Sequence, residues 1–170
     1  MTETSNASIQ HKTRQGQPVL VAIDFSEDSR AALLWAGKYA GCTDAPLVLL
    51  HVVHDLASYP GFYRNDQKEE LLPMQQVAEE MMAEFLSETK QEYPGLDWLD
   101  LARTELIIGM PPGRIVEMAG LLGAGTIVIG NRGLTGLPHM LLGSVAERVV
   151  ELASIPVVVV KADSKAGGSG

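Results

Sequence analysis

Five short apolar runs are the feature that most constrains how this chain folds. They are rich in valine, isoleucine and leucine, and they lie at residues 19–23, 47–53, 104–108, 126–129 and 156–160, although the third run opens with Thr104 and Glu105. Short apolar runs without a polar face are typical of strands buried on both sides, as in parallel sheets covered by helices. The runs therefore predict the strands of a parallel sheet.

Segments of helical period separate these runs. The first predicted helix ends near Gly41 and buries the face formed by Ala31, Leu34, Trp35 and Tyr39. The second runs to about Tyr93 and is marked by Leu71, Met74, Val77, Met81, Met82 and Phe85. A turn at residues 109–113 precedes the third helix, and the fourth covers residues 144–153. This alternation predicts an α/β fold, a doubly wound five-stranded parallel sheet with helices on both faces.

The length of 170 residues suits one compact domain. Residues 1–16 are polar and contain few side chains to bury, so we expect them to form a flexible arm. Residues 164–170 are rich in glycine and are expected to form a flexible tail. Residues 17–163 are therefore the predicted folded domain.

Charge and cysteine content argue against several classes of function. The formal net charge is −8 and the pI is about 4.9, so the surface repels nucleic acid. Cys42 is the single cysteine, and the four histidines show no metal-ligand spacing. No apolar run in the sequence reaches the roughly 20 residues that span a bilayer. We therefore expect a cytoplasmic protein with no membrane insertion, no metal centre and no nucleic-acid partner.

The segment after the fourth predicted strand carries the chemistry. It begins at Gly130 and Gly133 and ends at Gly143-Ser144, where the fourth helix is expected to start. Ligands of open α/β sheets bind beyond the carboxyl ends of the strands, where the strand order reverses. A helix start there offers free N–H groups and a positive dipole end to a phosphate. The alternative interpretation is a plain glycine-containing loop with Ser144 as the helix N-cap.

Other phosphate and catalytic motifs are missing from the sequence. There is no G-x-x-x-x-G-K-[ST] motif, and no G-x-S-x-G elbow. The first strand turns through Asp24-Phe25-Ser26 without a glycine, so the dinucleotide fingerprint is absent as well. Phosphate binding at the glycine segment is therefore predicted without P-loop, dinucleotide or hydrolase chemistry.

The spacing of this segment resembles the ATP-binding pattern of the universal stress protein family. That pattern, G-x2-G-x9-G-[ST], is met by Gly130, Gly133 and Gly143-Ser144 with both spacings intact. The resemblance covers roughly residues 17–162, including Val-Ala-Ile-Asp-Phe-Ser at 21–26, Leu-His-Val at 50–52 and Gly109-x-Pro111. It implies a Usp-like sheet of the type shared with adenine nucleotide alpha hydrolases.

Matching positions carry the family's nucleotide-binding roles onto this chain. By the resemblance, Asp24 lies beside the adenine or ribose, and Val52 meets the adenine through its backbone. Ala22 and Gly130 line the ribose, and the phosphates are surrounded by Gly133, Gly143, Ser144 and Val145. Ile129 and Arg132 complete the predicted set.

Which nucleotide is bound is left open between ATP and AMP. Ala146 stands where some ATP-binding members carry a hydroxyl, which weakens the case for a triphosphate more than for AMP. Mg²⁺ is expected only together with ATP, with Asp24 nearby. No general base or activated nucleophile is evident near the loop, so no catalytic residue is assigned.

Three polar residues near the segment have more than one interpretation. Asp24 and Ser26 compete for the N-cap of the first helix. Arg132 either pairs with a phosphate oxygen or is a solvated loop residue. Asp28 is expected only to favour the helix dipole in the first turn.

The resulting hypothesis is a stress-response regulator or energy sensor that binds an adenine nucleotide and signals to a protein partner. The alternatives are a slow ATPase or nucleotidyl-transfer enzyme, and an interaction module that binds no nucleotide. The last run, residues 156–160, has no following helix to cover its edge. Because the family commonly dimerises there, we expect a homodimer with antiparallel pairing of this strand.

Overall fold

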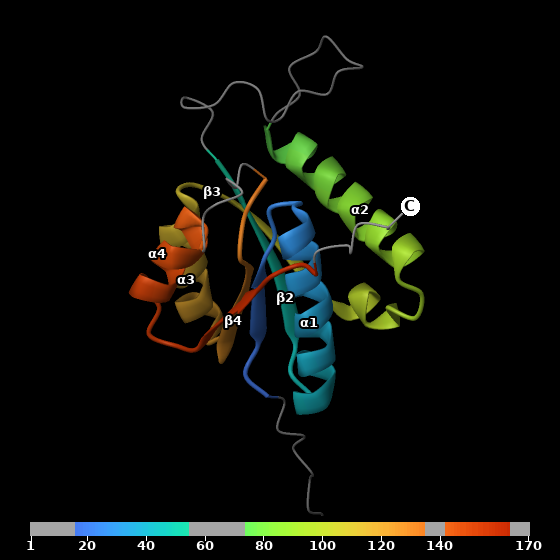
Figure 1. Cartoon of the computed structure of the whole chain (residues 1–170), viewed down its shortest axis with the longest axis horizontal. Coiled ribbons are helices and arrows are strands. Elements are labelled where there is room, and N and C mark those ends of the chain that lie inside the picture. The colour runs from blue at the N-terminus through green and yellow to red at the C-terminus, as the bar shows by residue number, and fades with distance from the viewer. Residues whose placement is uncertain (1–15, 55–73, 135–141, 164–170) are drawn as a thin grey trace, which may run out of the picture.

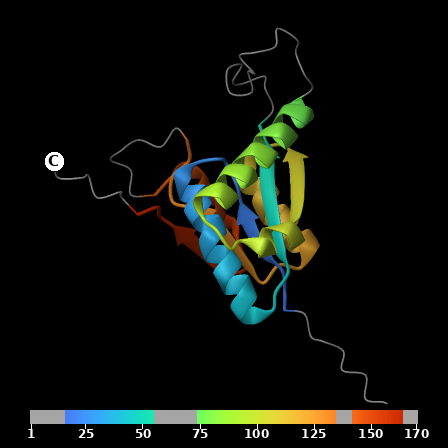
Figure 2. The ribbon, with the colours of Figure 1, turned by 90° about the vertical axis from the view of Figure 1, so that its right-hand side faces the viewer.

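Parallel strands form a single sheet between two layers of helices in the computed structural model of this chain (Figures 1 and 2). The structure describes residues 16–54, 74–134 and 142–163. The strands are β1 (Val19–Ala22), β2 (Leu47–Val53), β3 (Arg103–Ile108), β4 (Thr126–Gly130) and β5 (Val157–Val160). They lie in the order β3-β2-β1-β4-β5, and each neighbouring pair is parallel. The predicted fold class is confirmed.

Helices cover both faces of this sheet. They are α1 (Glu27–Thr43), α2 (Met74–Glu92), α3 (Pro111–Leu122) and α4 (Ser144–Leu152), with a short 3₁₀ helix, η1 (Asp97–Leu101). α1 and α2 pack on one face, and α3 and α4 pack on the other (Figures 1 and 2). Within the described ranges, no helix is long and apolar enough to cross a membrane.

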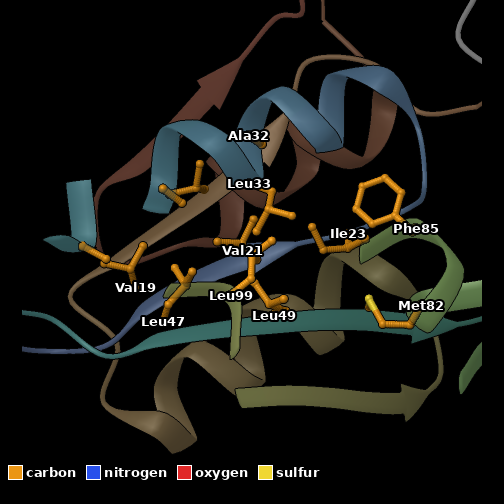
Figure 3. Packing of buried hydrophobic residues seen from close by; sticks show 13 residues of the cluster. Val19, Val21, Ile23, Ala32, Leu33, Leu47, Leu49, Met82, Phe85 and Leu99 are labelled. Atoms are coloured by element: carbon orange, nitrogen blue, oxygen red, sulfur yellow. The ribbon is translucent and has the colours of Figure 1, made fainter. Parts of the chain in front are cut away.

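The central strand β1 shows why a buried strand of this sheet is a continuous apolar run. The expected burial on both sides is wrong for the edge strand β3, whose residues are exposed or half-buried. Val19 and Val21 belong to the core under α1 and α2 (Figure 3), whereas Leu20 and Ala22 belong to the core under α3 and α4. None of these four side chains is more than 7% exposed. A strand buried on both faces has no position where a polar side chain meets water, so the alternation of half-exposed strands is lost.

The predicted buried face of α1 is wrong. The helix buries Ala32, Leu33 and Ala36, whereas Trp35 and Tyr39 are 37% and 38% exposed. Small side chains allow the helix to lie close to the sheet, and the larger apolar residues fall on a neighbouring stripe with the same period. The helical period alone does not show which of two such stripes is buried, because burial depends on how each stripe packs against the sheet and the neighbouring helices.

Two predicted element boundaries are also displaced. α1 continues past Gly41 to Thr43, and ends where Asp44 adopts a left-handed φ of 50° and donates its N–H to the oxygen of Ala40. α3 begins at Pro111, inside the predicted turn, because proline at the first helical positions needs no N–H partner.

Several predictions fall outside the described residues. They concern Leu71, residues 1–15 of the arm predicted at 1–16, and the tail at 164–170. Gly16, the last residue of that predicted arm, donates its N–H to the oxygen of Asp44 at 3.2 Å. The predicted domain boundaries at residues 17 and 163 therefore stay predictions.

Two glycines of α1 test the packing of this helix. A Cβ at Gly37 would overlap the Trp98 ring, whereas a Cβ at Gly41 would have no atom within 4 Å. We expect Gly37→Ala to displace the ring and lower the free energy of unfolding by about 1–3 kcal/mol. Gly41→Ala should leave it unchanged or raise it by up to about 1 kcal/mol. Urea unfolding measures both, and equal effects would contradict this packing.

Candidate functional site

The strand order reverses between β1 and β4. These two strands are paired, with Ala22 opposite Ile129, but β1 continues to β2 on one side and β4 continues to β5 on the other. Asp24 follows β1 and Gly130 ends β4, so both lie at the same edge of the sheet. The chain after these strands therefore lies where ligands bind in open α/β sheets.

Asp24 is held in place by Ser26. Its Oδ1 accepts hydrogen bonds from the backbone N–H of Ser26, at 3.1 Å, and from the Ser26 hydroxyl. Ser26 is also the N-cap of α1, since its Oγ accepts the N–H of Ser29 at 3.1 Å. The competition for this cap is thereby decided for Ser26, and Asp24 is left to face the loop after β4.

The intervening residue, Phe25, adopts a left-handed backbone with a φ of 68°. This conformation is strained for a bulky side chain, and it persists only where the surroundings hold it. The Phe25 ring packs 4.4 Å from the His51 ring and 5.7 Å from the Phe85 ring, measured between centroids. Packing beneath the site therefore holds the turn that presents Asp24.

His51 lies in this packed layer. Its Nδ1 is 2.8 Å from the backbone oxygen of Ile23, the residue before Asp24. Burial lowers the pKa of His51 below the ordinary value of 6.5, so the imidazole is neutral at neutral pH. A neutral ring with Nδ1–H donated to Ile23 fixes the backbone at the end of β1.

The glycines of the motif lie where the chain makes close contacts. A Cβ on Gly133 would lie 2.6 Å from Asp24 Oδ2, which places this glycine against the carboxylate. A Cβ on Gly143 would lie 2.8 Å from the Asn131 oxygen, and one on Gly130 would lie 2.8 Å from the Ser29 nitrogen. The second and third contacts are with backbone, so Gly130 and Gly143 are required by the packing of the protein itself.

Asp28 has a larger role than the sequence predicts. Its side chain is only 8% exposed, and it accepts the backbone N–H of Arg132 at 3.0 Å and that of Ala162 at 3.1 Å. One carboxylate thus joins the start of α1, the glycine loop and the chain after β5. No local pattern indicated this role, because the two partners lie 104 and 134 residues away along the chain.

Arg132 is not a free loop residue. Its Nε lies 3.7 Å from Asp28 Oδ2, and its side chain is 32% exposed. Its backbone oxygen lies 3.2 Å from the Ser26 hydroxyl oxygen, which brings the loop to the Asp24 turn. The solvated-loop interpretation is wrong for this residue, while its contact with a phosphate stays a prediction.

The start of α4 lacks a side-chain cap. Gly143 is the N-cap residue, so the interpretation of Ser144 as the N-cap is wrong, and Ser144 is the exposed first residue of the helix. The N–H of Gly143 donates to the Asn131 oxygen at 2.8 Å, which fixes the helix start against the loop. The first-turn N–H groups of Ser144 and Val145 therefore have no side-chain cap within the described part of the chain.

The remaining predicted residues are mainly buried. Ala22, Val52 and Ile129 belong to the core under α3 and α4, so the ligand groups they offer are backbone groups. Ala146 is 2% exposed and belongs to the same core, which explains a small apolar residue at this position. Residues 135–141, the middle of the motif, lie outside the described residues. No cluster of metal-ligating side chains occurs in the ranges that the structure describes.

The fold and the described loops together define an α/β protein with a candidate ligand site at its topological switch point. The model of the universal stress protein family matches residues 16–161. Universal stress protein MJ0531 of Methanocaldococcus jannaschii is 33% identical over 166 residues, which cover 94% of this chain and 91% of that protein. The chain belongs to the universal stress protein family, as its motif spacing predicted.

Solved structures agree with this assignment. Hypothetical protein MJ0577 has a TM-score of 0.65 at 27% identity, covering 87% of this chain and 97% of its own. A universal stress protein from Archaeoglobus fulgidus in complex with dAMP has a TM-score of 0.55 at 27% identity, covering 86% of this chain and 98% of its own. The chain spans about half the length of the Mycolicibacterium smegmatis and Mycobacterium tuberculosis universal stress proteins that it matches.

Asp28→Asn tests the junction between α1, the loop and β5. An amide has one acceptor oxygen and places N–H donors against the second backbone N–H, so we expect a loss of about 1–3 kcal/mol in the free energy of unfolding. Glu27→Gln is the matched control, because it removes an exposed acidic charge from the same helix turn. Chemical denaturation measures both variants, and a loss no larger than that of the control would contradict the role of Asp28.

Proposed function

We propose that this chain binds an adenine nucleotide at the carboxyl ends of β1 and β4, with its phosphates at the start of α4. The observation that carries the proposal is the α4 N-terminus, which no side chain of the described residues caps and which lies beside the glycine loop that contacts Asp24. A relative that is 27% identical is known in complex with dAMP, which supports an adenine nucleotide as the ligand.

The residues present fit the parts of such a ligand. First-turn N–H groups and the dipole of α4 suit a phosphate, and exposed Ser144 adds a hydroxyl donor. These local groups matter because the net charge of −8 gives no general attraction for anions. Asp24 Oδ2 is the carboxylate oxygen on the loop side, and it suits a ribose hydroxyl or, with ATP, Mg²⁺. Adenine would then meet the backbone at Val52, on the same edge of the sheet.

Nucleotide-dependent regulation in the cytoplasm is the role that we favour for this site. Asp24, Asp28 and Arg132 are charged side chains at the described part of the loop, and each already has a partner within the protein. Groups engaged in this way hold a binding site in shape, and their contacts would be broken if they moved protons or attacked a phosphate. We propose on this basis a stress-response regulator or energy sensor that binds ATP or AMP and signals to a protein partner.

Gly133→Ala tests the site. The new Cβ would lie 2.6 Å from Asp24 Oδ2 and push the carboxylate out of position. We expect purified protein to release an adenine nucleotide on denaturation, identified by mass spectrometry, and the variant to bind that nucleotide about tenfold more weakly in calorimetry, equivalent to about 1.4 kcal/mol.

Gly120→Ala is the matched control for that experiment. Its Cβ would have no atom within 4 Å, so the affinity should stay unchanged. Gly130 and Gly143 are unsuitable for this test, because a Cβ at either position meets backbone and alters the fold. Absence of released nucleotide, together with no heat on titration of ATP or AMP, would refute nucleotide binding.

We also propose a homodimer formed through β5. Among the strands that the structure describes, β5 pairs with β4 alone and is an edge of the sheet, and all four of its valines are half-buried. The oxygens of Pro156 and Val160 accept hydrogen bonds from the β4 side. Since the N–H and C=O of one strand residue point the same way, Val157 and Val159 direct theirs to the open edge. An unpaired edge of this kind invites antiparallel pairing with a second copy along residues 156–160.

Val159→Pro tests the edge. Proline removes an outward N–H and leaves the hydrogen bonds to β4 in place. We expect a dimer for the natural sequence and a folded monomer for the variant in sedimentation equilibrium at micromolar concentration. Circular dichroism checks the fold of the variant. A natural protein that sediments as a monomer would contradict the dimer.

A further inference from the structure

Two large aromatic side chains lie together on the outer surface of α1. Trp35 and Tyr39 are 37% and 38% exposed, and their rings stack with centroids 5.2 Å apart and an interplanar angle of 13°. Their partial burial is not explained by the core, because the sheet-facing stripe of α1 consists of other residues. The pair therefore forms an apolar surface without a described covering element.

The position of this pair follows from the helix geometry. Trp35 and Tyr39 lie seven and eleven residues after Asp28, which places all three on one stripe of α1. Asp28 contacts the N–H of Ala162, directly after β5. The stripe that carries the aromatic pair is thus the side of α1 that faces the β5 edge of the sheet.

The aromatic pair and β5 also extend over the same distance from the contact between Asp28 and Ala162. At about 1.5 Å per residue, Trp35 and Tyr39 lie roughly 10 and 16 Å along α1 from Asp28. At about 3.3 Å per residue, the strand that leads back from Ala162 covers the same length. Tyr39 accordingly lines a small pocket with Val19 and Thr126, the first residues of β1 and β4. The aromatic pair therefore lies on the side of α1 that faces β5, with Tyr39 at the level where β1 and β4 begin.

Valines of β5 extend this surface. Val158 and Val160 pack against the core on the α1 side and are half-buried. Together with Trp35 and Tyr39 they form what we term the α1–β5 apolar face. The net charge of the chain is −8, but these four side chains carry no charge, so a second copy buries none of its own charge by covering them.

We propose that the α1–β5 apolar face is covered by the same face of a second copy, with the aromatic pairs of the two protomers in contact across the twofold axis. This inference rests on the proposed dimer and names a second element of its interface. Pairing of β5 with its copy places three strand spacings of about 4.8 Å between the two β4 strands, roughly 14 Å in all.

This separation explains why the pair is aromatic. α1 lies over β4, with β1 and β5 on either side, so the α1 axes of the two protomers are also about 14 Å apart. Helices in direct contact are about 8–10 Å apart, so side chains must fill a gap of several ångströms. Stacked tryptophan and tyrosine rings fill such a gap, and twofold symmetry brings identical stripes face to face.

Alanine substitutions separate this contact from strand pairing. We expect Trp35→Ala and Tyr39→Ala each to weaken the dimer at least about tenfold in sedimentation equilibrium, as buried interface aromatics do. Tyr93→Ala is the matched control, because Tyr93 is 37% exposed but follows α2, away from β5. Nucleotide affinity should be unchanged in all three variants, since none of these residues lies at the site.

Tryptophan emission gives an independent measurement. In Trp98→Phe, Trp35 is the only tryptophan, and its emission should shift to shorter wavelength as the protein concentration rises through the dimer dissociation constant. The shift should be absent when Val159→Pro is added. A natural dimer whose stability is unaffected by Trp35→Ala and Tyr39→Ala would overturn this inference and leave the β5 dimer intact. A natural monomer would overturn both.

Discussion

Parallel pairing of β1 with β4 is the constraint on which the rest of this structure depends. β1 lies at the centre of the sheet, and its residues are buried from both faces, so its neighbours and their helices are arranged around it. Because β4 pairs directly with β1, the turn at Asp24 and the loop from Gly130 leave the sheet together. The strand order alone therefore places a candidate site at this edge of the sheet.

A single buried carboxylate then organises the loop. Asp28 accepts N–H groups from Arg132 and from Ala162, and Asn131 donates its own N–H to the oxygen of Val160 at 2.6 Å. The adjacent loop residues Asn131 and Arg132 are therefore both linked to the end of β5, Asn131 directly and Arg132 through Asp28. Arg30 connects the other side of α1 to α2, because its guanidinium lies 4.8 Å from the Phe85 ring and donates a hydrogen bond to Thr89.

The structure gives two different reasons for the glycines of the motif. Gly130 and Gly143 are required because backbone atoms approach them closely, whereas Gly133 lies against the carboxylate of Asp24. A motif spacing therefore identifies the family and the loop correctly while leaving open which glycine bears on a ligand. Tertiary contacts show which glycines the packing of the protein requires, because the atoms that crowd each position come from segments far away in the sequence.

The amino-acid sequence by itself determined the five strands, the alternation with helices, the family and the position of the glycine loop. These follow from local periodicity and spacing, which a single segment contains. Only the tertiary structure decided the buried stripe of α1, the N-cap roles of Ser26 and Gly143, and the junction at Asp28. Each of these depends on which of several local options finds a partner across the fold, and partners such as Ala162 lie 134 residues away from Asp28.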